Sequence, residues 1–175
     1  MTLFKNKYRI ESFRLKNWDY RNAGAYFITI CTKNRENYFG KITDGEMQLS
    51  QIGEIVENEW IKTPEIRPDM NLKLGEYVVM PNHFHAILII GQNEYNIQPD
   101  HGEYNNQFGP QSKNVSSIIR GFKSAVTMAS RMIYPDFGWQ SKFHDHIIRN
   151  HGEYLRIENY IINNPVNAGL VINWE

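Results

Sequence analysis

The chain has 175 residues, of which 41% are hydrophobic and 13% aromatic, and its formal net charge at pH 7 is zero. This length suits one domain with a substantial core, so we expect a single domain over residues 1–175. No stretch approaches the roughly 18–20 apolar residues of a membrane-spanning helix, and residues 1–5 do not resemble the start of a secretory signal, so we expect none. The lone Cys31 excludes an internal disulfide, and we expect a cytoplasmic protein with no membrane partner.

Charge is unevenly distributed along the chain. Residues 1–41 contain nine Lys or Arg against three Asp or Glu, residues 42–111 three against eleven, and residues 112–175 seven against five. A neutral protein can therefore carry a basic face, which permits a nucleic-acid partner without requiring one. Near the N-terminus, basic residues that include Arg14 and Lys16 alternate with aromatics, a composition that suits either DNA contacts or the cover of a core edge.

Short runs rich in β-branched, aromatic and aliphatic residues predict strands. Four such runs occur, at 25–32, 72–80, 83–90 and 142–150. Only a Met-Pro-Asn corner separates the second run from the third, so these two strands should be antiparallel neighbours. The polar connection that follows the first run is expected to contain at most a short extended piece near residues 38–42.

Apolar residues that recur every three or four positions predict three helices. They cover 49–60, 115–132 and about 152 to 163 or 164. Ser50 can cap the first and Asn114 or Ser116 the second, whose buried face should end at Met132. Pro165 should stop the third. Residues 91–114 are polar and lack periodicity, so we expect a flexible exposed loop there.

The order of these elements predicts a fold class. Strand, helix, strand, strand, helix and strand in succession give an α+β, ferredoxin-like β-α-β-β-α-β arrangement. Such a fold has a four-stranded antiparallel sheet with two helices on one face, and its first and third strands are central. The additional C-terminal helix is then available to cover the other face.

Two histidines begin the third predicted strand. Because side chains alternate along a strand, His83 and His85 share one face and Phe84 points to the other. Two imidazoles about 6–7 Å apart can converge on one metal ion or phosphate, although packing alone also explains such a triplet. His144 and His146 alternate in the same way, and we expect His146 to orient the site rather than to act as a ligand.

Tyr160 and Asn164 are four residues apart on the last predicted helix and should share a face. If this helix covers the histidine strand, a phenol and an amide oxygen can approach His83 and His85. The tyrosine could then attack a phosphodiester, while Mg²⁺ or Mn²⁺ on the imidazoles and the amide polarised the phosphate. Taken singly, Tyr160 also fits simple packing and Asn164 a helix cap before Pro165.

Five segments together resemble one known family. They are Thr-Lys-Asn-Arg at 32–35, Met-Pro-Asn-His-Phe-His at 80–85, Trp-Gln at 139–140, the strand at 143–149 and the segment 160–171. In this order they are similar to the REP-associated tyrosine transposases, which belong to the single-tyrosine transposases of the histidine–hydrophobe–histidine nuclease superfamily. The resemblance covers about residues 8–171, without the loop 91–114.

The resemblance implies an activity and assigns roles to residues. It implies a metal-dependent endonuclease that cuts and rejoins single-stranded DNA beside hairpins of repetitive palindromic elements, through a 5′-phosphotyrosine intermediate. Tyr160 would be the nucleophile, and His83, His85 and Asn164 would hold Mg²⁺ or Mn²⁺. The protein would act as a monomer or homodimer. The basic residues available for contact with DNA are Arg14, Lys16, Arg35, Arg120, Lys123 and Arg149.

Two other functions remain open at this point. A non-catalytic module that binds single-stranded nucleic acid would carry exposed aromatic residues on the central strands, for stacking on bases. A metal-dependent hydrolase of a small phosphoester would need a closed pocket and an activated water molecule. In that case DNA cleavage would survive the substitution Tyr160→Phe.

Overall fold

The computed structural model describes residues 3–4, 8–9, 15, 18–97 and 111–167. Arg14, Lys16 and residues 98–110 of the expected loop lie outside the described residues. Near the N-terminus, β1 (Leu3–Phe4) and β2 (Tyr8–Arg9) pair in antiparallel fashion. In the part of the chain that the structure describes, no helix is both long and apolar enough to cross a membrane.

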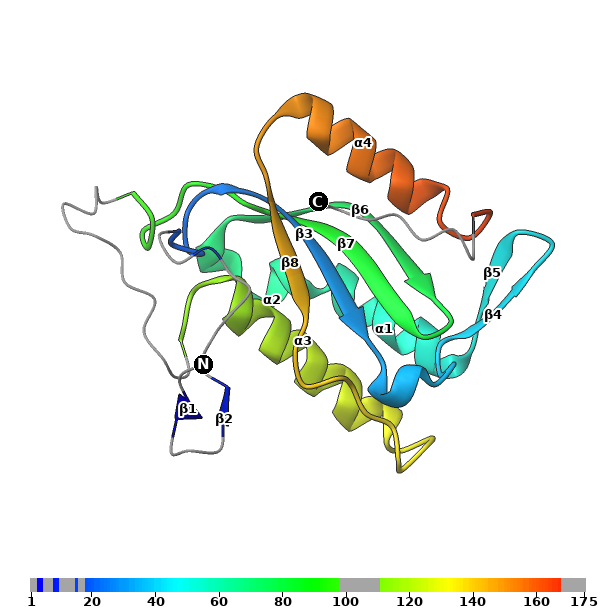
Figure 1. Cartoon of the computed structure of the whole chain (residues 1–175). Coiled ribbons are helices and arrows are strands. Elements are labelled where there is room, and N and C mark those ends of the chain that lie inside the picture. The colour runs from blue at the N-terminus through cyan, green and yellow to red at the C-terminus, as the bar shows by residue number, and fades with distance from the viewer. Residues whose placement is uncertain (1–2, 5–7, 10–14, 16–17, 98–110, 168–175) are drawn as a thin grey trace.

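A four-stranded antiparallel sheet organises the fold (Figure 1). The strands are β3 (Gly24–Cys31), β6 (Leu72–Met80), β7 (His83–Ile90) and β8 (His144–Ile148). Their order across the sheet is β6-β7-β3-β8, so the first and third strands of the predicted motif are central. The predicted α+β class and sheet are confirmed.

Two long helices, α1 (Gln51–Ile61) and α3 (Val115–Ser130), cover one face of the sheet (Figure 1). Ser50 and Asn114 cap them, because each side-chain oxygen accepts a bond from a backbone N–H of the first turn. Short turns, α2 (Thr63–Ile66), η1 (Lys33–Arg35) and η2 (Pro68–Met70), complete the connections. Apolar side chains from the sheet and both helices form the main core.

Met132 is a correction to the expected buried face of α3. Its side chain is 87% exposed. The helix ends at Ser130, so Met132 lies in the turn beyond it and no longer follows the helical periodicity that would point it at the core.

The last helix, α4 (His151–Ile162), covers the opposite face of the sheet (Figure 1). Ile157 and Ile161 of α4 form a second, smaller apolar cluster with Phe27 and Ile87 of the central strands. The close approach requires a glycine in β6: a Cβ atom on Gly75 would lie 2.8 Å from the Tyr154 hydroxyl and 2.9 Å from the Ile87 Cβ. The expectation that the final helix covers this face is therefore confirmed.

A hairpin occupies the connection that was expected to be mostly polar coil. Strands β4 (Gly40–Thr43) and β5 (Glu46–Leu49) pair across the two-residue turn Asp44-Gly45. Both turn residues have positive φ, 53° and 78°, as in the hairpin turns that favour Asp-Gly. The dipeptide flanked by Ile42 and Met47 was the sequence signal for this hairpin.

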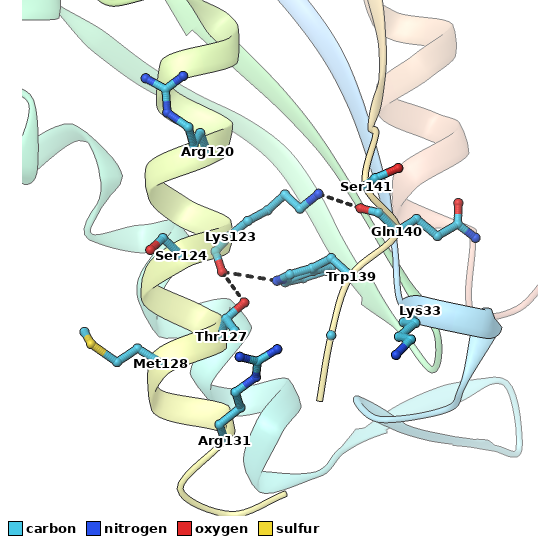
Figure 2. Close-up of a pocket in the computed structure, with 11 residues that line it drawn as sticks. Lys33, Arg120, Lys123, Ser124, Thr127, Met128, Arg131, Trp139, Gln140 and Ser141 are labelled. Atoms are coloured by element: carbon cyan, nitrogen blue, oxygen red, sulfur yellow. Dashed lines mark hydrogen bonds between the residues drawn. The ribbon is translucent and has the colours of Figure 1, made fainter. Parts of the chain in front are cut away.

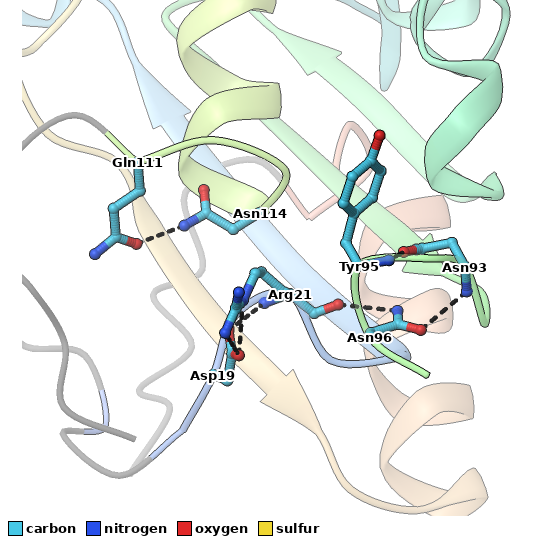
Figure 3. A network of polar contacts seen from close by, with 7 residues as sticks. All are labelled: Asp19, Arg21, Asn93, Tyr95, Asn96, Gln111 and Asn114. Carbon is cyan, nitrogen blue, oxygen red and sulfur yellow. Dashed lines mark hydrogen bonds and ion pairs between the residues drawn. The ribbon is translucent and has the colours of Figure 1, made fainter. Parts of the chain in front are cut away.

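Hydrogen bonds hold the described ends of the expected loop 91–114 (Figure 3). The backbone N–H of Asn93 donates to Asn96 Oδ1 at 2.9 Å, and Asn96 Nδ2 donates to the Arg21 carbonyl at 3.0 Å. At the other end Asn114 caps α3 in a reciprocal capping box. Both ends of this segment are thus tied to regular elements of the domain.

Candidate active site

The histidine pair lies at the start of β7, on the sheet face covered by α4. In the register of the sheet, His83 lies opposite Cys31 and His85 opposite Thr29. The two rings have centroids 4.7 Å apart and are inclined at 75°. Alternation along the strand sends Phe84 into the main core instead. The structure therefore places both histidines where the sequence predicted them.

His85 is the centre of the site because each of its ring nitrogens has a partner. Nδ1 lies 2.8 Å from Thr29 Oγ1 on β3, and Nε2 lies 3.3 Å from the Tyr160 hydroxyl on α4. The ring also stacks on Phe27, with centroids 5.3 Å apart. Only 6% of the residue is exposed, and this burial lowers the pKa of His85 to about 3. The imidazole is neutral at pH 7.

His83 is oriented by the residue before it. Asn82 Nδ2 donates to the Arg35 carbonyl at 3.2 Å, which fixes the amide so that Oδ1 lies 2.8 Å from His83 Nδ1. Since that oxygen can only accept, we assign the ring proton to Nδ1 and the lone pair to Nε2. Burial, with a smaller contribution from the positive charge of Arg35, lowers the pKa of His83 to about 4.

Tyr160 reaches the histidines because of how α4 is seated. Ile157 and Ile161 are fully buried against the sheet, which fixes the rotation of the helix about its axis. Tyr160 lies beside these two residues on the helix surface, three positions after Ile157, and its ring contacts Phe27 edge-on and His85 at a centroid distance of 5.4 Å. Helix and strand thus bring together a phenol and an imidazole that are 75 residues apart in sequence.

The donor set at this face fits a divalent metal ion in part. Two neutral imidazoles, each held from behind by a hydrogen bond on Nδ1, are the form in which histidine binds metals. Within the described residues, no three His, Cys, Asp or Glu side chains gather at a metal-binding distance. A third protein ligand would therefore be an amide or hydroxyl oxygen. Asn164 is 8% exposed and lies in the turn that follows α4, beyond Ile162.

The second histidine pair lies on the same face of the sheet, on β8. His144 is exposed and pairs with Thr29, so it lies across β3 from His85. His146 Nε2 is 2.7 Å from Glu153 Oε1, and Glu153 Oε2 accepts the backbone N–H of Arg149 at 2.7 Å. His146 thereby ties β8 to the first turn of the helix that carries Tyr160.

The basic candidates are distributed over different parts of the surface. Arg35 lies close enough to lower the pKa of both His83 and His85. Arg120 and Lys123 lie on α3, in a groove on the other side of the sheet (Figure 2). Arg149 follows β8 at the end away from His144, where its backbone N–H shares the Glu153 carboxylate with His146.

Sequence reasoning missed the residues that support the histidines. Thr29 lies two residues after Phe27, on the face of β3 that His85 shares, but no local signal in the sequence gives the register that pairs it with His85. Asn82 adjoins His83 in the Met-Pro-Asn corner, and its polar side chain was the available signal. Glu153, three residues into α4, carried no signal that linked it to His146.

The known proteins that are similar to this chain include two relatives and a solved structure. An uncharacterized protein of Haemophilus influenzae is 39% identical over 165 residues, which cover 89% of this chain and 87% of the relative. The REP-associated tyrosine transposase of Escherichia coli K12 is 24% identical over 152 residues, covering 87% of this chain and 72% of that protein. A REP-associated tyrosine transposase bound to a REP hairpin has 25% identity and a TM-score of 0.61, over 93% of this chain and 76% of the other. No protein-family model matches the chain.

The antiparallel sheet, with its histidine pair facing a tyrosine on the last helix, has the architecture of a transposase. The comparisons name the same group of proteins that the sequence motifs resemble. In sequence and in fold, the chain is similar to the REP-associated tyrosine transposases.

Proposed function

We propose that this protein is a DNA endonuclease and strand transferase that uses Tyr160 as its nucleophile. The observation that carries the proposal is the 3.3 Å distance between the Tyr160 hydroxyl and His85 Nε2, on the face that also holds His83. The substrate is single-stranded DNA beside a hairpin of a repetitive palindromic element. The solved relative, which is bound to a REP hairpin, supports this choice.

The proposed reaction is a phosphoryl transfer to tyrosine. The Tyr160 oxygen forms a bond to the scissile phosphorus as the bond to the 3′-oxygen breaks, so the 5′-phosphate of the downstream (3′) portion of the cut strand becomes a phosphotyrosine ester. The phenol loses its proton and the departing 3′-oxygen gains one. The ester retains the energy of the broken bond, so attack by a 3′-hydroxyl on the same phosphorus can rejoin DNA and regenerate the tyrosine.

His83 and His85 are the residues that would hold Mg²⁺ or Mn²⁺, with Asn164 as the proposed oxygen ligand. The ion, when bound, would polarise the scissile phosphate and stabilise charge that develops on its oxygens. Thr29 and Asn82 hold the two imidazoles from behind and keep the Nε2 atoms turned toward the substrate side. The depressed pKa of each ring keeps it unprotonated at neutral pH, as a ligand must be.

The non-catalytic binding module fits these observations less well. Such a module stacks bases on exposed aromatics of the central strands. On the α4 side of this sheet, the aromatic residue of β3 is Phe27, which is 3% exposed and lies under α4. Histidines occupy the neighbouring positions of β7. The face is therefore better suited to hold an ion and a phosphate than to stack bases.

An adduct assay with hairpin DNA tests the proposal. Hairpins from repeats flanking the gene, with a single-stranded tail and a label at the 5′ or the 3′ end, are incubated with Mg²⁺ or Mn²⁺ and then denatured. We expect wild type to form a denaturation-resistant adduct that carries the 3′ portion of the cut strand. Tyr160→Phe and His83→Ala should form none.

Tyr154→Phe is the matched control, since it removes a phenolic hydroxyl from the same helix and should retain the adduct. Cleavage that persisted in Tyr160→Phe would instead favour a hydrolase with an activated water. Tight binding without an adduct in any variant or with either metal would indicate a protein that only binds DNA. It would refute the assignment of Tyr160 as the nucleophile.

A further inference from the structure

We propose that a basic groove on α3 binds the backbone phosphates of the DNA whose scissile phosphate reaches the histidine site. The groove lies between α3 and the segment 138–141, on the sheet side away from α4 (Figure 2). This inference rests on the proposed function and adds to it a second contact surface, remote from Tyr160.

The lining of the groove suits a polyanion. Four of its side chains are cationic, none is acidic, and the rest are hydroxyl, amide and apolar groups around a space of about 740 Å³. The cations are Lys33, Arg120, Lys123 and Arg131. Figure 2 shows Lys123 and Arg131 on the side of α3 toward Trp139 and Gln140, and Arg120 further along the same helix. Although the net charge of the whole chain is zero, the surface of this groove carries a concentrated positive charge.

Helical spacing turns these residues into a continuous stripe. Arg120, Lys123, Thr127 and Arg131 follow one another at intervals of three or four residues, so they lie on one face of α3. From Arg120 to Arg131 the helix rises about 16 Å at 1.5 Å per residue. That distance corresponds to about five phosphates of one DNA strand at 3.4 Å per step along the helix axis. The stripe can thus contact several phosphates at once.

The positive charge of the stripe is not neutralised by the described part of the protein. Arg120 donates to the Gln111 carbonyl, Lys123 to the Gln140 carbonyl at 2.7 Å and Arg131 to the Phe137 carbonyl. These uncharged acceptors orient the side chains but leave the charges intact. Among the described residues, the cations that pair with carboxylates lie elsewhere.

The groove connects to the histidine site around the end of β3. Lys33 lines the groove, and Arg35, in the same short turn, lies near enough to lower the pKa of His85. Cys31 lies near both sides: burial raises the pKa of its thiol, and the positive charges of Arg35 and Lys123 partly offset that rise. The backbone of Gln140 donates to the Cys31 carbonyl at 2.9 Å, which joins the groove wall to this strand end. A phosphate backbone can therefore follow positive charge from α3 to His83.

Equilibrium binding as a function of salt tests the groove. In a Tyr160→Phe background, which prevents covalent trapping, the exposed cations are removed in the triple variant Lys33→Gln, Arg120→Gln and Arg131→Gln. We expect the Kd for a tailed hairpin to rise at least about tenfold near 0.1 M salt. Each lost phosphate contact lowers the slope of log Kd against log salt by about 0.9, so the slope should fall by about two to three.

The matched control is the triple variant Lys41→Gln, Lys62→Gln and Lys73→Gln, which removes the same charge from exposed lysines on other elements. Its slope should change by less than about one. Thermal unfolding of both triple variants verifies that each remains folded. A blunt hairpin and an unstructured strand of equal length, tested separately, identify whether stem or tail phosphates occupy the groove.

The groove proposal is overturned if both triple variants bind alike while the protein with Tyr160 intact still forms its adduct. Failure of the proposed function looks different: wild type would form no adduct with any hairpin.

Discussion

One imidazole connects the two halves of the site. His85 contacts Thr29 through one nitrogen and Tyr160 through the other, and its ring rests on Phe27. Because Nδ1 and Nε2 are both engaged, the ring has little freedom to rotate about its last side-chain bond. The position of the Tyr160 hydroxyl is therefore defined relative to the sheet and not by α4 alone.

Burial of the two imidazoles should make stability depend on pH. The pKa values of about 4 for His83 and about 3 for His85 lie below the ordinary value of 6.5. Below pH 6.5 the unfolded chain binds protons that the folded chain does not, so the free energy of unfolding falls as pH decreases. Each imidazole contributes a slope of up to about 1.4 kcal/mol per pH unit.

Urea unfolding between pH 6.5 and 5 measures this dependence. His85→Gln should remove about half of the contribution of the pair, while His151→Gln, at an exposed position, should leave the slope unchanged. Equal slopes in wild type and His85→Gln would contradict the expectation.

Under the proposed function, Asn82 should matter for catalysis through its hydrogen bond to His83. Asn82→Ala removes the acceptor that holds the proton on His83 Nδ1, so Nε2 is no longer the fixed lone-pair position. We expect the rate of adduct formation to fall about 10–100-fold, with a small change in Tm. Asn82→Asp retains an oxygen for Nδ1 and should recover part of the rate. An unchanged rate in Asn82→Ala would refute this positioning role.

At the scale of elements, the placement of α4 depends on a glycine in the strand beneath it. An alanine Cβ at position 75 would lie within 3.0 Å of both Tyr154 and Ile87, and the Ile87 Cβ cannot move without its strand. Gly75→Ala should therefore displace α4, at a cost of about 1–3 kcal/mol, and reduce adduct formation.

The control is Gly152→Ala, a helical position where the added Cβ meets only Asn150 at 3.4 Å. It should leave activity intact and preserve or slightly raise stability. Thermal unfolding and the adduct assay on the two variants measure the difference. Equal behaviour would mean that the contact at Gly75 is readily relieved.

Strand alternation made the histidine face predictable, and helical periodicity located α4. The bounds of β6 and β7 agree with the prediction residue for residue, because their apolar runs end at the Met-Pro-Asn corner. What could not be read from the sequence depends on register between distant strands. The contact of Thr29 with His85 spans 56 residues, and no local pattern encodes it.

The end of α4 shows a second limit of sequence reasoning. Spacing of four residues suggested that Tyr160 and Asn164 share a helix face. The helix stops at Ile162, so the position of Asn164 is set by the turn and not by helical geometry. Its role as a ligand remains a prediction.

For the whole molecule, we expect the proposed nucleophile to act on the histidine site of its own chain. Tyr160 and His85 meet within one polypeptide. Mixing Tyr160→Phe with His83→Ala should therefore not restore the adduct, because neither chain contains both groups. The mixture is assayed on the tailed hairpin beside wild type diluted to the same concentration. Recovery of about a quarter or more of wild-type adduct would indicate exchange of α4 between chains.

The two apolar clusters on opposite faces of the sheet hold different parts of the molecule in place. The main core between the sheet and α1 and α3 holds most of the buried side chains, whereas α4 is held by a small cluster around Ile157 and Ile161. Substitutions in the small cluster can displace Tyr160 while the main core stays intact. Under the proposed function, one or two mutations there would abolish cleavage and leave a folded protein that still binds DNA, open to recruitment for regulation by its host.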